Sequence, residues 1–153
     1  MKLTTSQASF HLTILGYQFP DAEGETYDAN WLRIRIDVSG PNGAWSATDP
    51  ALLTYEVARL ADWLEAQQTG AAKTPAVSFL EPMLLFRVVE HSSEGEKALR
   101  VHFGAFVKPS WSSEGSAGQE NLWLDFPLSQ IDLAAAAKEL RAELKRYPQR
   151  AER

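Results

Sequence analysis

The chain has 153 residues, a net charge of −5 at neutral pH and no cysteine. This length suits one domain, and a composition of 44% hydrophobic and 23% charged residues indicates a folded chain rather than a disordered one. The lack of cysteine excludes disulfides and thiolate chemistry, and the acidic balance argues against direct binding to nucleic acid. Because no apolar run approaches the roughly 20 residues that span a bilayer, and no signal-peptide pattern opens the chain, we expect a cytoplasmic protein without a membrane partner.

Two alternating strands are predicted before the first dense turn. Residues 10–17 form the first, an acidic loop over residues 20–27 follows, and residues 31–38 form the second. Alternation is typical of half-buried strands, because successive side chains point to opposite faces. The predicted core face of the second strand consists of Leu32, Ile34, Ile36 and Val38. The turn at residues 39–43 contains Asn-Gly, which favours a hairpin and a short return strand over residues 44–47.

Helical spacing of apolar residues predicts two helices. The first covers residues 50–67, because Asp49 can cap free N–H groups and a proline fits the first helical position. The second covers residues 129–147, where a serine followed three residues later by Asp132 resembles a capping box. Residues 149–153 are expected to be a frayed tail.

The stretch between the two helices predicts four more strands, over residues 74–80, 83–89, 98–107 and 121–126. In the third of these we expect Arg100 and His102 to face outward. Short turns join most of the strands, which favours antiparallel neighbours. The sequence therefore predicts an α+β fold, with a curved antiparallel sheet of about six or seven strands and two helices, one between strands and one C-terminal. We expect a single domain over residues 1–153.

Recognisable catalytic and metal motifs are absent from the sequence. His11, His91 and His102 do not form an HxH or HExxH pattern, although His11 and His102 would lie close together if their strands paired. There is no nucleophile elbow, phosphate-binding glycine loop or dinucleotide fingerprint, and the acidic loop lacks the spacing of a calcium loop. We therefore expect no catalytic residue, no metal site and no cofactor.

Two surface features could contact a partner. The first is the acidic loop with its carboxylates Asp21, Glu23, Glu25 and Asp28. The second is a set of outward tryptophan, arginine and histidine side chains on the strands, namely Trp31, Arg33, Arg35, Arg100, His102 and Trp123. Tryptophan and arginine are common anchors at interfaces. The alternative is that the tryptophans pack under loops with arginines stacked on them.

A series of short motifs carries a family resemblance. In chain order they are LGYQFP at 15–20, YDANWL at 27–32, WSATDP at 45–50, LTYEV at 53–57, DWL at 62–64 and YPQR at 147–150. Together these motifs resemble the WapI-type immunity proteins of bacterial polymorphic-toxin systems and their unassigned relatives. The resemblance spans almost the whole chain. It implies a small cytoplasmic protein that binds and neutralises the toxic domain of a cognate toxin, and it carries over no catalytic residue.

Three hypotheses follow. The first is a non-catalytic, toxin-neutralising protein whose partner surface comprises Asp21, Glu23, Glu25, Asp28, Trp31, Arg33 and Arg35. Since some toxins of these systems are nucleases with basic surfaces, an acidic protein would suit such a partner. The second is a small-ligand-binding protein or an enzyme of unknown class, which requires an open sheet face or a deep pocket with converging histidine and carboxylate groups. The third is a structural module that forms a homodimer through its Trp/Arg face.

Overall fold

The computed structural model describes residues 1–24, 26–111 and 122–150. Its strands and helices are β1 (Lys2–Thr4), β2 (Ser9–Tyr17), β3 (Trp31–Gly40), β4 (Gly43–Leu53), α1 (Thr54–Thr69), β5 (Ala76–Ser78), β6 (Leu84–Glu90), β7 (Lys97–Phe103), β8 (Trp123–Pro127) and α2 (Leu133–Arg146). Short 3-10 helices, η1 (Asp28–Asn30), η2 (Ala105–Val107) and η4 (Leu128–Gln130), lie in the connections. Among the described residues, no helix is long and apolar enough to cross a membrane.

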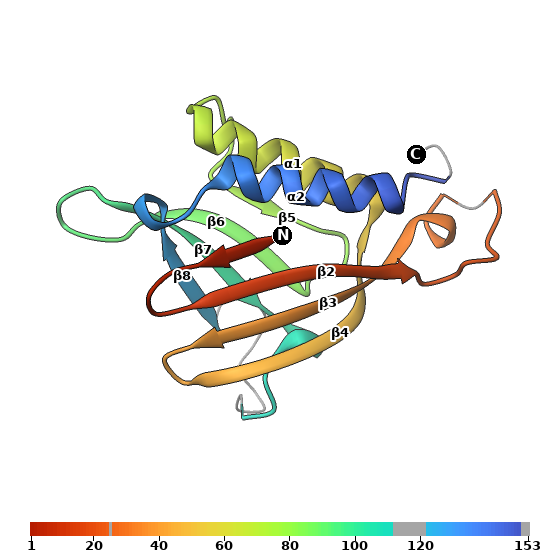
Figure 1. The fold of residues 1–153 in the computed structure, drawn as a ribbon, viewed down its shortest axis with the longest axis horizontal. Coiled ribbons are helices and arrows are strands. Elements are labelled where there is room, and N and C mark those ends of the chain that lie inside the picture. The colour runs from red at the N-terminus through yellow and green to blue at the C-terminus, as the bar shows by residue number, and fades with distance from the viewer. Residues whose placement is uncertain (25, 112–121, 151–153) are drawn as a thin grey trace.

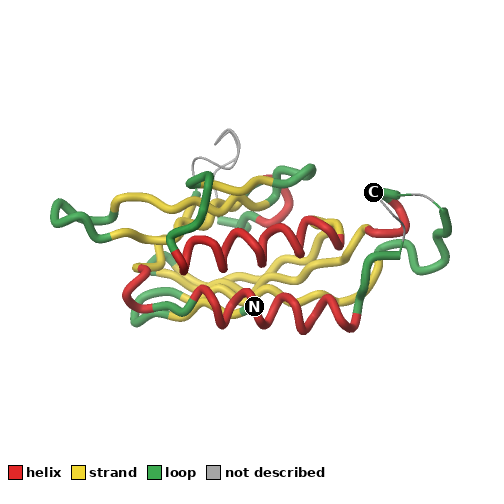
Figure 2. The backbone as a smooth tube through the Cα atoms, turned by 90° about the horizontal axis from the view of Figure 1, so that it is seen from above, coloured by secondary structure: helices red, strands yellow, loops and turns green. Residues whose placement is uncertain are grey.

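The strands form two four-stranded antiparallel sheets, which we call the N-terminal sheet, β1-β2-β3-β4, and the C-terminal sheet, β5-β6-β7-β8. Their apolar faces pack together, with the Phe10 ring centroid 5.9 Å from that of Phe86 and 6.0 Å from that of Phe103. The helices α1 and α2 lie side by side along one edge of both sheets (Figures 1 and 2). The α+β class, the antiparallel strands and the two helices are confirmed.

The prediction of one sheet of six or seven strands is wrong. The chain leaves the N-terminal sheet through α1 and begins a second sheet at β5, so β4 and β5 do not pair. Each sheet has one apolar face, and the two faces bury each other, as in other two-layer packings of sheets. A strand sequence specifies which of its faces is apolar, but it does not specify whether the next strand joins the same sheet.

The predicted core face of β3 is confirmed, because Leu32, Ile34, Ile36 and Val38 are all buried. The predicted Asn-Gly hairpin joins β3 to β4, but β4 is much longer than residues 44–47 and runs to Leu53. Its pairing with β3 shifts register where Pro50 and Ala51 lie opposite Arg33. A bulge of this kind accommodates a proline, which cannot donate a ladder hydrogen bond.

The predicted start of α1 at Pro50 is therefore wrong, since Asp49 and Pro50 belong to β4 and the helix begins at Thr54. The buried Glu56 takes over the capping role. Its carboxylate accepts a hydrogen bond from the backbone N–H of Leu53 at 3.1 Å and another from the backbone N–H of Leu80 at 2.7 Å. An acidic side chain in the first turn stabilises the positive helix end.

The start of α2 also differs from the prediction. Ser129 lies in η4, and Asp132 is the N-cap, accepting a hydrogen bond from the backbone N–H of Ala135 at 2.9 Å. The last turns of α2 cover the part of the β2 edge that the short β1 leaves unpaired. There, the Glu143 carboxylate accepts a hydrogen bond from the backbone N–H of Ile14 at 2.6 Å. Covering an exposed strand edge in this way prevents unwanted strand pairing.

Candidate partner-binding site

The acidic loop between β2 and β3 presents its carboxylates to solvent. Asp21, Glu23 and Asp28 are exposed, and Glu25 lies outside the described residues. Beneath them Asn30 is fully buried and accepts a hydrogen bond from the Thr54 hydroxyl at 2.8 Å. The loop is therefore attached to the start of α1 while its charges remain available to a partner.

Arg150, which follows α2, holds the same loop in place. Its guanidinium donates to the backbone oxygens of Phe19 at 3.2 Å and Ala22 at 3.0 Å, and it lies 4.7 Å from the ring centroid of Tyr17. These bonds use backbone acceptors, so they do not pair the guanidinium with Asp21, Glu23 or Asp28. The predicted frayed tail stays a prediction for residues 151–153, which are outside the described part of the chain.

Arg33 and Arg35 do not join the acidic loop. Both are exposed on the outer face of the N-terminal sheet, where Arg35 pairs with Asp37 at 2.8 Å. The Asp37 carboxylate also accepts a hydrogen bond from Ser46 at 2.6 Å. The guanidinium, followed by this hydroxyl, lowers the pKa of Asp37 to about 2. The Arg35 charge is thus already paired within the chain.

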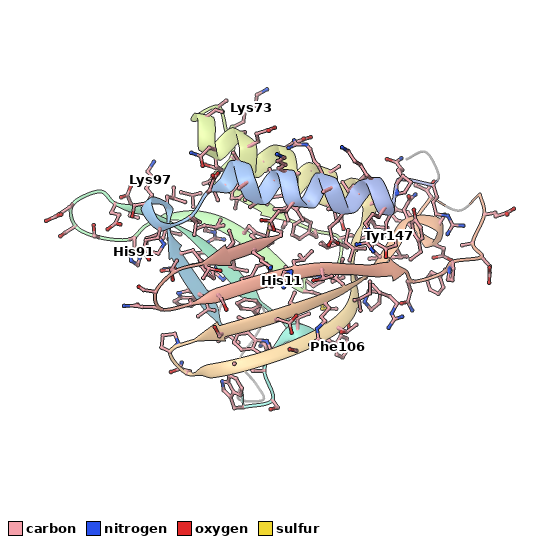
Figure 3. The ribbon with its side chains drawn as sticks, viewed as in Figure 1. His11, Lys73, His91, Lys97, Phe106 and Tyr147 are labelled. Atoms are coloured by element: carbon pink, nitrogen blue, oxygen red, sulfur yellow. The ribbon has the colours of Figure 1, made fainter. Side chains whose placement is uncertain are left out.

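Trp31 is half-buried and lines a pocket next to the acidic loop, which we call the Trp31 pocket. The pocket has a volume of about 370 Å³ and is lined by Gln18, Phe19, Trp31, Asp49, Pro50, Glu81, Met83 and Phe106. The labelled Phe106 side chain projects from η2 beside the bent part of β4 (Figure 3). The pocket therefore combines residues from the loops at both sheets with the bulged part of β4.

Two carboxylates face this largely apolar pocket. Burial, and after it the neighbouring Glu81 charge, raises the pKa of Asp49 above its ordinary value. Among the described residues, no side chain forms an ion pair or a hydrogen bond with the carboxylate of Asp49 or of Glu81. The pocket thus holds negative charge that no described side chain balances by an ion pair.

The second half of the predicted outward set behaves differently. Arg100 lies 4.6 Å from the ring centroid of Trp123 and donates to both carboxylate oxygens of Asp125, at 2.7 and 2.9 Å. His91 approaches the same carboxylate at 3.7 Å. His102 lies on the same face of β7 as Arg100, as predicted, but it is only 4% exposed because its ring packs 5.9 Å from that of Trp123. We call these five residues the Trp123 cluster.

The two histidines that could have formed a site lie on different sheets. His11 is on β2 and His102 is on β7, and these strands do not pair. His11 lines an open depression with Ser9 and Asp37 on the outer face of the N-terminal sheet. Within the described ranges, no group of three histidine or acidic side chains could hold a metal ion. His11 and His102 therefore do not converge on one site, and the depression at His11 is open rather than deep.

Comparison with known proteins identifies the family. The sequence profile of the Immunity protein WapI-like family matches residues 2–148. The chain belongs to this family. No curated protein and no solved structure matches it. The matched range of this WapI-like chain includes the acidic loop, the Trp31 pocket and the Trp123 cluster, so all three features lie within the family domain.

Sequence reasoning missed most of the Trp31 pocket in this WapI-like protein. The sequence predicts Asp49 as a helix cap and includes Phe19 only in the motif LGYQFP, and it assigns neither of them, nor Glu81 or Phe106, to a binding pocket. These residues come from separate segments and meet only through the packing of the two sheets. The local signals were Trp31, which begins an alternating strand immediately after the acidic loop, and the motifs LGYQFP and WSATDP, which contain Phe19 and Asp49.

Proposed function

We propose that this WapI-like protein is a non-catalytic immunity protein, which binds the toxic domain of a cognate bacterial toxin in the cytoplasm and blocks its activity. The observation that carries the proposal is the family match across residues 2–148. Binding would neutralise the toxin by covering the surface that acts on its substrate. Such a role requires a complementary surface on this protein and no chemistry of its own.

The end of the molecule that contains the acidic loop supports this role. Asp21, Glu23 and Asp28 are exposed there, and the Trp31 pocket opens beside them. An apolar centre with a charged periphery is the usual anatomy of a protein interface. Exposed charges of one sign also accelerate association with a partner of opposite sign. The loop would therefore attract a basic toxin surface toward the pocket.

Co-expression with the toxin domain encoded by the gene immediately upstream tests the proposal. We expect the protein to restore growth of cells that express this domain, and to elute with it as a stable complex. Failure of both rescue and complex formation would contradict the proposed function, as would a neighbouring gene without a toxin domain.

Charge reversal in the loop tests the partner surface. Asp21→Lys, Glu23→Lys and Glu25→Lys together should reduce the association rate about tenfold or more at low salt, while the circular dichroism spectrum stays unchanged. Glu90→Lys with Glu94→Lys and Glu96→Lys, in the β6–β7 hairpin at the opposite end of the molecule (Figure 1), provides a control with the same change in net charge. Association equally slow in both variants would argue that only net charge matters, and unchanged association would exclude the loop.

A further inference from the structure

The Trp31 pocket exposes aromatic surface from three separate segments. Phe106 is 76% exposed, Phe19 is 44% exposed, and Trp31, which lines the same pocket, is half-buried. Apolar rings exposed around a concavity lose the stabilisation that burial would supply. Exposed apolar surface that gathers in this way is typical of an interaction site rather than of a scattered surface residue. The pocket therefore has the aromatic walls of a binding site.

The carboxylates of Asp49 and Glu81 in this pocket favour a cationic ligand. Asp49 and Glu81 lie close enough for the charge of Glu81 to raise the pKa of Asp49, in addition to the effect of burial. Two carboxylates that share an apolar environment repel each other, and an added cation would stabilise both charged forms. No described side chain supplies that cation. A cation supplied by a bound partner would balance this charge.

The Trp123 cluster shows which cation suits this combination of groups. There, one guanidinium stacks 4.6 Å from the Trp123 ring centroid and donates two hydrogen bonds to Asp125. A flat guanidinium can satisfy an aromatic ring and a carboxylate at the same time, whereas an ammonium group offers only a point charge. The Trp31 pocket has a tryptophan and carboxylates but lacks the arginine.

The size of the pocket fits a single side chain. Its volume of about 370 Å³ is at the low end of the roughly 300–1,000 Å³ of ordinary ligand sites. Such a space has room for one long side chain, and it is too small for a folded segment. Phe19 directly precedes the acidic loop, so an occupant of the pocket would also contact the proposed partner surface.

We propose that the Trp31 pocket receives an arginine side chain of the toxin domain, which stacks against Trp31 and pairs with Asp49 and Glu81. This inference rests on the proposed function and specifies how the partner is anchored. The acidic loop then mainly sets the association rate constant of the toxin, and the pocket mainly sets its dissociation rate constant.

Binding of the upstream-encoded toxin domain gives the first test. The double variant Asp49→Asn/Glu81→Gln should weaken the complex by roughly 30-fold or more, mainly through faster dissociation. Glu90→Gln/Glu94→Gln removes the same charge at the far end and should change affinity by less than about threefold. Phe106→Ala, which keeps both carboxylates, should also speed dissociation. Wild-type affinity in the double variant would overturn the arginine proposal and leave the proposed function intact.

An arginine probe tests the pocket without any toxin. N-acetyl-L-arginine amide should shift the Trp31 indole N–H resonance with a dissociation constant on the order of 1 mM, as expected for so small a ligand. The neutral citrulline analogue and the Asp49→Asn/Glu81→Gln variant should show no saturable shift. If the toxin domain does not bind, the proposed function fails and this titration still decides the pocket. Absence of a saturable shift with arginine amide would overturn the proposal.

Discussion

The Trp31 pocket and the Trp123 cluster both contain a tryptophan and carboxylates. Among the described residues, however, only the Trp123 cluster includes an arginine that pairs with its carboxylate. In the Trp123 cluster, Arg100 stacks on the tryptophan and neutralises Asp125. In the Trp31 pocket, Asp49 and Glu81 face aromatic side chains without a described cation between them. The comparison teaches that a tryptophan among charged residues does not by itself identify an interface. The informative property is whether the chain balances those charges itself.

The largest expected difference between the two regions is in toxin binding. Trp31→Ala should cost about 2 kcal/mol or more of binding free energy, because it removes a central aromatic anchor. Trp123→Ala should cost less than about 0.5 kcal/mol, since its ring is already occupied by Arg100. Isothermal titration calorimetry with the upstream-encoded toxin domain measures both. Equal losses would remove the distinction between the pocket and the cluster.

The next largest effect is on the stability of the Trp123 cluster. Arg100→Ala should lower the free energy of unfolding by about 1–2 kcal/mol, because it breaks two charge-assisted hydrogen bonds to the partly buried Asp125. Arg100→Lys should lower the free energy of unfolding by less, since lysine keeps the positive charge but cannot make the two parallel hydrogen bonds to Asp125. Urea denaturation measures both variants, and toxin affinity should be unchanged. A stable Arg100→Ala variant with weakened toxin binding would reverse the roles of the two regions.

A smaller effect, of opposite sign, is expected in the Trp31 pocket. Asp49→Asn should raise the free energy of unfolding by less than about 1 kcal/mol, because it removes a repelled charge at a partly exposed site. The pKa of Asp49 is higher in the folded protein than in the unfolded chain. The wild-type protein therefore loses stability as the pH rises from the Asp49 pKa of the unfolded chain to that of the folded protein. The difference between wild type and variant should therefore be present at neutral pH and absent below the ordinary aspartate pKa. Urea denaturation at several pH values measures it.

The smallest effect belongs to the exposed Arg35–Asp37 pair, a second example of charges balanced within the chain. Asp37→Asn should lower the free energy of unfolding by less than about 1 kcal/mol at neutral pH, because both side chains are solvated. The folded pKa of Asp37 is lowered to about 2 from 3.8. The stabilisation by the charged Asp37 is therefore fully present above the pKa of the unfolded chain, and it is lost as the pH falls toward 2. This pH dependence has the opposite sign to that of Asp49. A stability difference that grows on acidification would contradict this assignment.

Local sequence pattern predicted the parts of the fold that depend on neighbours in the chain. Alternation identified the buried face of β3, and Asn-Gly identified the β3–β4 hairpin. The Asp49-Pro50 pair misled the prediction because it suits a helix start as well as a strand bulge. The pairing of strands into two sheets could not be predicted, since it depends on which apolar faces meet.

The candidate site was predictable only in part. Trp31 and the acidic loop stood out because they are adjacent in sequence to a clear strand. Glu81 and Phe106 could not be assigned to a site, since they reach the pocket from loops that pack together only after both sheets form. Strand alternation places Arg33 and Arg35 on the same side as Trp31, yet they do not line the pocket. Alternation describes the direction of side chains but not their neighbours beyond the strand.

Hydrogen–deuterium exchange on the complex with the toxin domain tests the central claim most directly. The acidic end with the Trp31 pocket should become protected, so exchange should slow in residues 18–24, 79–83 and 104–107. Exchange in residues 91–97 and 123–127, around the Trp123 cluster, should stay as it is in the free protein. Protection confined to the Trp123 cluster, with none at the pocket, would contradict the account.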